Sequence, residues 1–193
     1  MYENSKRQIT CPVCGSPAPM IGRIHYTCNK CTWDSLYDTI DISYKDELTS
    51  PLSNLFPHKF VFYTCDEDKT TCLSMESFIQ SLRVKDPLLQ KYVCENYTGL
   101  AAYKLRRTLG DWRDDGIVYW QGKPIIREFE EYDKLITTAY DRLFESNPIF
   151  REVVLKKFKN FHIIHSIGDD SRSQSLLTED EYRYQLNRLM KKV

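Results

Sequence analysis

Four cysteines near the N-terminus have the spacing of metal ligands. The segment "CPVCG" supplies Cys11 and Cys14, and "YTCNKC" supplies Cys28 and Cys31. Each Cys-x-x-Cys turn can present two thiolates to one side of a tight knuckle, and two knuckles complete a tetrahedral, closed and therefore structural site. A thioredoxin-like redox pair is the alternative, but neither pair lies between a strand and a helix in a βαβ pattern. We therefore predict one structural Zn²⁺ and no redox cofactor.

The predicted zinc ribbon occupies residues 1–42 and is too small to have a core of its own. Metal binding would supply its folding free energy. Such a ribbon can bind nucleic acid or brace its neighbour. Residues 1–50 carry five Lys/Arg and six Asp/Glu, which is a poor electrostatic footprint for binding phosphates.

A second group of chemically capable side chains lies on one predicted helix. In "SMESFIQSLRV" the apolar residues recur at helical spacing after Ser74, a good N-cap. Glu76, Gln80 and Arg83 then form a polar stripe on another face of the helix. The alternative is a solvated face with an intrahelical ion pair.

Basic and aromatic residues gather in "GLAAYKLRRTLGDWR" and in the strand-like "DGIVYWQGKP". They offer phosphate contacts beside flat rings on which a base could stack. A solvated basic helix and two core tryptophans are the alternative. The residues concerned are Lys104, Arg106, Arg107, Arg113, Trp112 and Trp120.

Composition predicts a folded protein. The chain has 193 residues, 41% of them hydrophobic, and a formal net charge of zero, so no chain-wide field attracts nucleic acid or anionic membranes. No apolar run is long enough to span a membrane, and the N-terminus lacks the apolar segment of a secretory signal. We therefore expect a cytoplasmic location, no membrane partner and reduced thiols. Cys65, Cys72 and Cys94 have no ligand spacing and receive no role.

The sequence patterns of the elements that must position these residues predict a mainly helical α+β domain. "KFVFYTC" resembles a strand, "EYDKLITTAYDRLFESNPIF" a long amphipathic helix and "FHIIHSIG" a buried strand. A capping box, Thr178 with Glu181, begins the last predicted helix. Residues 43–53 are a polar connector and residues 54–193 the main domain.

The order of the motifs over residues 52–190 resembles the NADAR superfamily, whose best known members are YbiA-like. The resemblance is carried by "LSNLFPHKF", "SMESFIQSLR", "AAYKLRR" and "YDRLFESNPIFREVVL". It implies a YbiA-like, α-rich fold that hydrolyses N-glycosidic bonds. Some members cleave phosphoribosylated riboflavin-pathway intermediates, and others remove ADP-ribose from guanine in DNA and so counter ADP-ribosylating toxins.

The resemblance also implies site residues. Arg83 stands where the family has a lysine, and "HSIGDDSRSQSLLTEDEY" replaces the common Gly-rich C-terminal motif, so substrate preference is not carried over. His165 is a candidate for the pocket rim, with a histidine of the core as the alternative. The residues that match family positions are Asn54, Glu76, Gln80, Lys104, Arg107 and Trp120.

These residues suit the cleavage of a ribose C1–N bond, which builds positive charge on the sugar. Glu76 would stabilise that charge or orient the attacking water, and the N-terminus of its helix should favour its ionised form. Arg83, Lys104 or a water would supply a proton or hydrogen bond to the departing base. We expect Asn54 to hold ribose hydroxyls, Lys104 and Arg107 a pyrophosphate, and Trp120 a base.

Three functions remain open from the sequence. The first is an N-glycosidase that removes ADP-ribose from guanine in DNA, with single-stranded DNA as partner and a toxin or phage-defence context. The second is an N-glycosidase of phosphoribosylated small molecules, and the third is a non-catalytic NAD or ADP-ribose binding module. We favour the first because a zinc ribbon is a natural nucleic-acid accessory and because the C-terminal pattern departs from the riboflavin-linked members.

Overall fold

The chain divides into two compact units. The computed structural model describes residues 8–11, 14–21, 25–31, 39–41, 50–157, 162–164 and 171–192. One unit comprises Met1–Asp41 with Asn160–Ile164, and the other comprises Ile42–Lys159 with His165–Val193. Of the predicted connector 43–53, only residues 50–53 belong to the described part.

Short strands form the N-terminal unit. Strands β1 (Gln8–Thr10), β2 (Pro17–Ile21) and β3 (His25–Tyr26) make an antiparallel sheet in the order β1-β2-β3. Strand β4 (Thr39–Asp41) pairs in parallel with β9 (His162–Ile164). The strand predicted in "FHIIHSIG" is therefore present, but it groups with the N-terminal unit because its backbone pairs with β4.

Helices dominate the larger unit, as the mainly helical α+β prediction required, and its strands form only two-stranded sheets. None of the helices in the described ranges has the length and apolar character needed to cross a bilayer. In chain order the elements are η1 (Ser50–Leu52), β5 (Phe60–Phe62), η2 (Asp66–Asp68), β6 (Thr70–Cys72), α1 (Met75–Ser81), α2 (Pro87–Asn96), α3 (Gly99–Lys104), η3 (Leu105–Arg107), β7 (Ile117–Trp120), β8 (Lys123–Ile126), α4 (Glu130–Ser146), α5 (Pro148–Glu152), η4 (Val153–Lys157) and α6 (Glu179–Met190).

The described part of the larger unit contains two antiparallel hairpins. Strand β5 pairs with β6, and β7 pairs with β8. The turn between β7 and β8 consists of Gln121 and Gly122, whose φ angles of 50° and 76° are those of the type I′ turn that suits twisted hairpins. The Gln90 side chain accepts a hydrogen bond from the Gln121 backbone at 2.8 Å and so ties this turn to α2.

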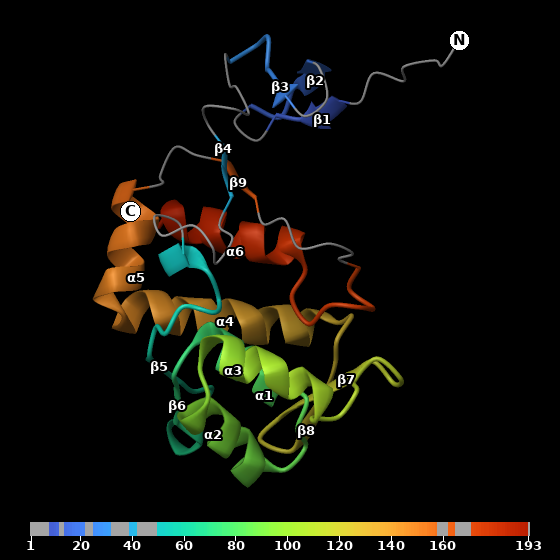
Figure 1. Cartoon of the computed structure of the whole chain (residues 1–193), viewed down its shortest axis with the longest axis vertical. Helices are drawn as coiled ribbons and strands as arrows, with labels where there is room; N and C mark the ends of the chain where they lie inside the picture. The colour runs from blue at the N-terminus through green and yellow to red at the C-terminus, as the bar shows by residue number, and fades with distance from the viewer. Residues whose placement is uncertain are drawn as a thin grey trace. The chain divides into compact units, whose positions relative to one another are not determined.

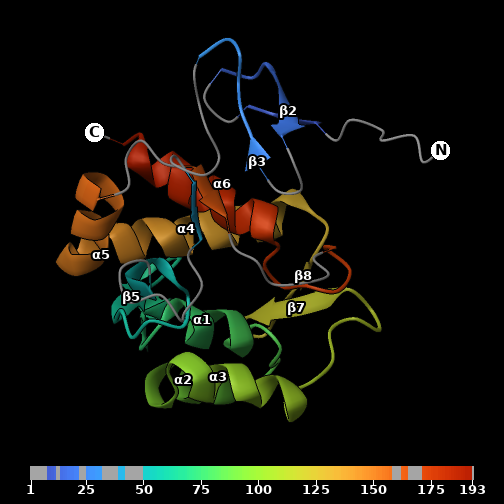
Figure 2. The ribbon, with the colours of Figure 1, turned by 45° about the horizontal axis from the view of Figure 1, so that its top comes forward.

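Helix α1 is the centre of the larger unit. All seven of its residues are buried, and the helix packs against α2, α3 and α4. Figures 1 and 2 both show α1 between α4 on one side and α2 on the other. Ser74 caps its N-terminus, as predicted, by accepting a hydrogen bond from the Ser77 backbone at 3.1 Å. The polar side chains of α1 therefore need partners inside the protein.

A buried ion pair ties the C-terminal helix to the rest of the unit. Arg127 is 0% exposed and donates two hydrogen bonds, at 3.0 and 2.6 Å, to the carboxylate of Glu181. Its Nε donates to the carbonyl of Ser175, and its guanidinium lies over the Tyr132 ring. Glu181 also accepts from the Thr178 backbone, which confirms the predicted capping box. We call this group the Arg127 clasp; it fixes the segment before α6.

We predict that Arg127→Met lowers the free energy of unfolding by about 3 kcal/mol, because the partly buried Glu181 carboxylate loses its bidentate partner and keeps only Arg172. Lys134→Met is the control, since the Lys134–Glu130 pair is 70% and 80% exposed and contributes at most about 1 kcal/mol. Urea denaturation followed by circular dichroism measures both. Equal, small losses would show that the clasp does not hold α6.

Candidate functional site

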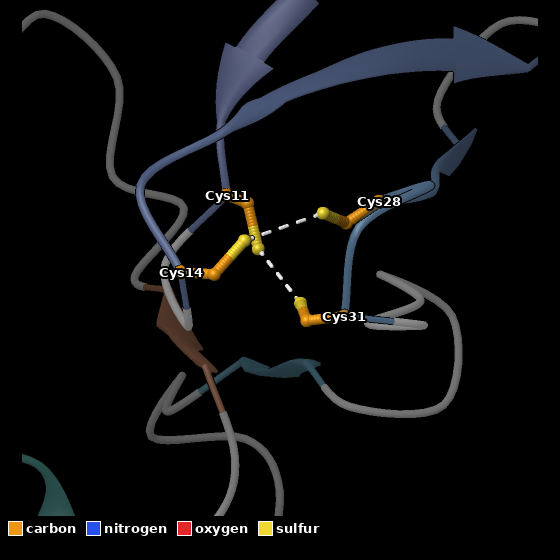
Figure 3. A group of neighbouring side chains, drawn as sticks. All are labelled: Cys11, Cys14, Cys28 and Cys31. Atoms are coloured by element: carbon orange, nitrogen blue, oxygen red, sulfur yellow. Dashed lines mark hydrogen bonds between the residues drawn. The ribbon is translucent and has the colours of Figure 1, made fainter.

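The four N-terminal cysteines converge. The sulfur atoms of Cys11 and Cys31 are 3.5 Å apart, as are those of Cys14 and Cys28, and all four lie within 4.8 Å of one another. Figure 3 shows the four side chains pointing toward one another. The knuckle at Cys11 closes through a 2.9 Å hydrogen bond from the Gly15 backbone to the Cys11 carbonyl, and Gly15 adopts a φ of 71° that favours glycine.

This geometry fits a metal ion. Tetrahedral coordination at about 2.3 Å from each thiolate places neighbouring sulfurs roughly 3.8 Å apart, close to the separations in the cluster. Cys11 and Cys28 are buried, and Cys14 and Cys31 are partly buried, so the site is closed as in structural centres. The four cysteines that the sequence selected therefore lie together as a metal site requires.

A pocket in the larger unit brings the predicted polar stripe together with other segments. Its volume is about 550 Å³. The predicted stripe forms one wall, with Glu76 and Gln80 on α1 and Arg83 beyond the end of the helix at Ser81, so the prediction that all three lie on one helix was wrong for Arg83. The segment 174–178 that precedes α6 contributes another wall. The side chains that matter for its chemistry are Asn54, Glu76, Gln80, Arg83, Arg106 and Arg113.

Glu76 is the buried acid of this pocket. It is 8% exposed, and its backbone N–H, unpaired within the first turn of α1, donates to the Asn54 carbonyl at 3.0 Å. Burial raises the pKa of its carboxyl from the ordinary 4.5 to about 7, against the opposing effects of the Gln80 hydrogen bond and of Arg83 and Arg106. The prediction that the helix N-terminus keeps Glu76 ionised was therefore wrong in direction. Desolvation outweighs a helix-terminus effect of roughly 0.3–1 kcal/mol.

Gln80 and Arg83 have hydrogen-bonding capacity left over. The Gln80 amide donates from Nε2 to Glu76 Oε1 at 2.9 Å, and this bond directs its own Oε1 away from the carboxylate. Within the described part of the chain, Gln80 Oε1 and Arg83 Nε are buried without a partner. Buried polar atoms are nearly always satisfied, so these two indicate a place for a ligand or an ordered water.

A hydrogen bond from the core fixes the orientation of the Asn54 side chain. The Tyr140 hydroxyl of α4 donates to Asn54 Oδ1 at 2.5 Å, which leaves the Nδ2 donor for other partners. Tyr140 is fully buried, so this orientation is fixed by the core. Tyr140 belongs to the long amphipathic helix that the sequence predicted, but no local signal connects it with Asn54.

Two arginines and a tyrosine make the cationic rim of the pocket. Arg106 stacks over the Tyr103 ring at 4.1 Å, and both line the pocket. Arg113 donates from Nε and Nη2 to the carbonyl of Gln174, at 3.2 and 3.0 Å, and so holds the opposite wall. Arg106 and Arg113 belong to the basic group noted in the sequence, whereas Tyr103 and segment 174–178 were missed.

Other predicted residues lie outside this pocket. Lys104 and Arg107 are exposed and are not among its lining residues. Trp120 is 5% exposed, packs against Phe62 and Phe78, and donates from Nε1 to Asp68 at 3.0 Å. A ring buried in this way offers no face to a base, so the expected stacking role does not hold.

His165, the remaining predicted residue, falls outside the described residues.

A larger pocket, of about 610 Å³, lies between α4 and α6 but has a different character. Each of its carboxylates has a cationic partner. The pairs are Glu130 with Lys134, Asp133 with Arg172, Asp180 with Arg183 and Glu181 with Arg127. The carboxylates of the larger pocket are thus already compensated. The smaller pocket, with an incompletely compensated buried acid and unpartnered atoms among its described residues, is the better candidate for chemistry.

Comparison with protein families matches residues 47–191 to the model described as Bacteriophage protein GP30.3. The chain belongs to this family. All of the residues that line the pocket around Glu76 fall inside the matched range of the GP30.3 family, and the four-cysteine cluster precedes it. Comparisons with curated proteins and with solved structures gave no match.

Metal removal should unfold the N-terminal unit. We expect a metal:protein ratio near unity by elemental analysis, and Cys14→Ser should abolish it because three thiolates no longer close the site. Cobalt substitution should give the sulfur-to-metal charge-transfer absorption of a thiolate site. Cys65→Ser is the control, since Cys65 is exposed and outside the cluster. Undiminished metal in Cys14→Ser would refute the four-cysteine site.

The pKa of Glu76 also predicts a pH-dependent stability. The folded state holds this proton up to about pH 7 and the unfolded chain releases it near 4.5, so stability falls as pH rises through that window. The pKa change corresponds to at most about 3 kcal/mol. Glu76→Gln should therefore match the wild type near pH 4 and exceed its stability at pH 8, as measured by urea denaturation. Glu95→Gln, at a partly exposed site on α2, should show no such trend.

Proposed function

We propose that the chain is an N-glycosidase that hydrolyses a ribose–base bond, with ADP-ribosylated guanine in DNA as its substrate. The observation that carries the proposal is the buried Glu76 carboxylate, which shares a pocket with two rim arginines. The resemblance of the motifs to the NADAR superfamily supports it, because Asn54, Glu76 and Gln80 match family positions and line the same pocket.

The chemistry asks Glu76 to act at the anomeric carbon. As the C1–N bond breaks, its electron pair leaves with the base and positive charge develops on the ribose, which a carboxylate stabilises. A water attacks C1 and passes a proton to Glu76, the departing nitrogen takes up a proton from solvent, and Glu76 returns its proton to solvent, so one water is consumed for each C1–N bond broken. A carboxyl with a pKa of about 7 is suited to exchanging protons at neutral pH.

The rim suits a phosphorylated sugar. The guanidinium group of Arg106 provides paired donors that match phosphate oxygens, and bidentate Arg–phosphate contacts are among the stronger hydrogen bonds in proteins. Arg113, whose nitrogens are held by the Gln174 carbonyl and the Asp111 carboxylate, adds positive charge beside it. This pair takes the role that the sequence gave to Lys104 and Arg107. Asn54, with Oδ1 occupied by Tyr140, has a free amide donor for a ribose oxygen.

The N-terminal cysteines complete the proposal. We assign zinc to the cluster, because four thiolates in a closed tetrahedral arrangement are typical of structural Zn²⁺. The ion would hold the unit folded and take no part in hydrolysis. The ribbon would help to seat single-stranded DNA, and the family's description as a bacteriophage protein is compatible with the phage context expected from the sequence.

The deciding experiment incubates single-stranded DNA carrying ADP-ribosylated guanine with the protein and follows the products by mass spectrometry. We expect release of ADP-ribose with restored guanine, and a loss of at least about a hundredfold in Glu76→Gln, because it removes a charge that stabilises the transition state. Glu95→Gln should retain full activity.

The other outcomes separate the alternatives. Turnover of phosphoribosylated pyrimidines without turnover of modified DNA would favour the small-molecule enzyme. Binding of ADP-ribose without any turnover by zinc-loaded protein would favour the non-catalytic module and contradict the proposed activity.

A further inference from the structure

The Gln80 amide has one heteroatom engaged and one unused. Its Nε2 donates to Glu76 Oε1 at 2.9 Å, so the orientation of the amide is fixed and Oε1 is left as a buried acceptor. Gln80 is 5% exposed and lines the pocket. Leaving a buried acceptor unpaired costs about 1–3 kcal/mol, which a ligand that supplies an O–H or N–H donor would recover.

The position of this acceptor relative to Glu76 limits what the donor can be. The two heteroatoms of one amide are closer together than a hydrogen bond is long, so Oε1 lies within two hydrogen-bond lengths of the carboxylate. If the carboxylate acts at C1 of a ribose, the attacking water lies within that reach, and so do three polar atoms of the substrate: the ring oxygen, the departing nitrogen and the 2-hydroxyl oxygen.

Only one of these three atoms is a suitable donor. The ring oxygen carries no proton. The departing nitrogen must gain a proton as the bond breaks, and an acceptor facing its N–H would push electron density onto it and slow its departure. The 2-hydroxyl has a proton to give, and hydrogen bonds to this group strengthen in glycosidase transition states.

We propose that Gln80 Oε1 accepts a hydrogen bond from the ribose 2-hydroxyl and thereby makes the enzyme selective for ribosyl over 2-deoxyribosyl bonds. This inference rests on the proposed glycosidase function. Its consequence concerns the substrate itself: every nucleotide of a DNA strand carries a 2-deoxyribosyl–base bond, and an enzyme that repairs DNA must leave those bonds intact. Gln80 would exclude them because they lack the donor.

This preference for ribosyl bonds would be the reverse of the order in which the two kinds of bond are cleaved without an enzyme. A 2-hydroxyl withdraws electrons and disfavours positive charge at C1, so uncatalysed cleavage is faster for 2-deoxyribosyl bonds. A preference for ribose must therefore come from the protein. Sites built around a substrate hydroxyl can reject analogues that lack it by large factors.

The test compares DNA in which guanine carries ADP-ribose with DNA in which it carries the 2-deoxyribosyl analogue of the same bond. The wild type should cleave the ribosyl substrate at least about a hundredfold faster. Gln80→Leu, which keeps a similar volume but has no acceptor, should bring the two rates to within about tenfold. Gln185→Leu is the matched control, since Gln185 is 4% exposed on α6 and lies outside this pocket, and it should keep the wild-type ratio.

Failure of the inference and failure of the proposed function give different results. Equal cleavage of both substrates by the wild type would overturn the role of Gln80 while leaving the glycosidase function intact, as would an unchanged ratio in a folded Gln80→Leu. If the wild type cleaves neither substrate, the proposed function fails. Calorimetric titration then compares ADP-ribose with its 2-deoxy analogue, and equal affinities would overturn the hydroxyl contact as well.

Discussion

The burial of α1 on every side is the constraint on which the pocket depends. A seven-residue helix packed between α2, α3 and α4 has no solvent-exposed face for polar side chains. Its serines are satisfied locally, since Ser77 donates to the Ser74 carbonyl and Ser81 to the Phe78 carbonyl. Glu76 and Gln80 remain, and they line the pocket together with Arg83, which follows the end of the helix.

Arg127 and Glu76 are buried ionisable residues of the larger unit, and their charges are compensated to different extents. In the Arg127 clasp, two guanidinium nitrogens meet two carboxylate oxygens and the remaining donor reaches a carbonyl, so no charge is left without a partner. At Glu76 the compensation is incomplete, and the carboxyl responds with a raised pKa. The first arrangement stabilises the fold and holds segment 174–178 in place. The arrangement at Glu76 leaves hydrogen-bonding groups available to a ligand, as a binding site requires.

Local sequence patterns predicted part of the fold and of the candidate site. Cysteine spacing selected the four residues of the cluster, helical periodicity selected the stripe of α1, and the capping box of α6 followed from Thr178 and Glu181 alone. Local patterns could not predict contacts between segments that are far apart in the sequence. Whether a tryptophan stacks on a ligand or fills a core depends on what packs over it, and Trp120 is covered by Phe62 and Phe78. In the same way, helical phase decided that Arg106 and Tyr103 line the pocket while their neighbours Lys104 and Arg107 do not.

The chemistry of the pocket depends most on the protonation state of one carboxyl group, that of Glu76. Titration of the Glu76 side chain by NMR, with carbon-13 in the glutamate carboxyls and Glu76→Gln for assignment, measures its pKa directly. A midpoint near 7, as burial requires, would show that the pocket withholds water from this carboxyl and leaves it ready for a ligand. A midpoint near 4.5, the ordinary value, would show a solvated side chain and contradict the central claim that Glu76 is the buried acid of the site.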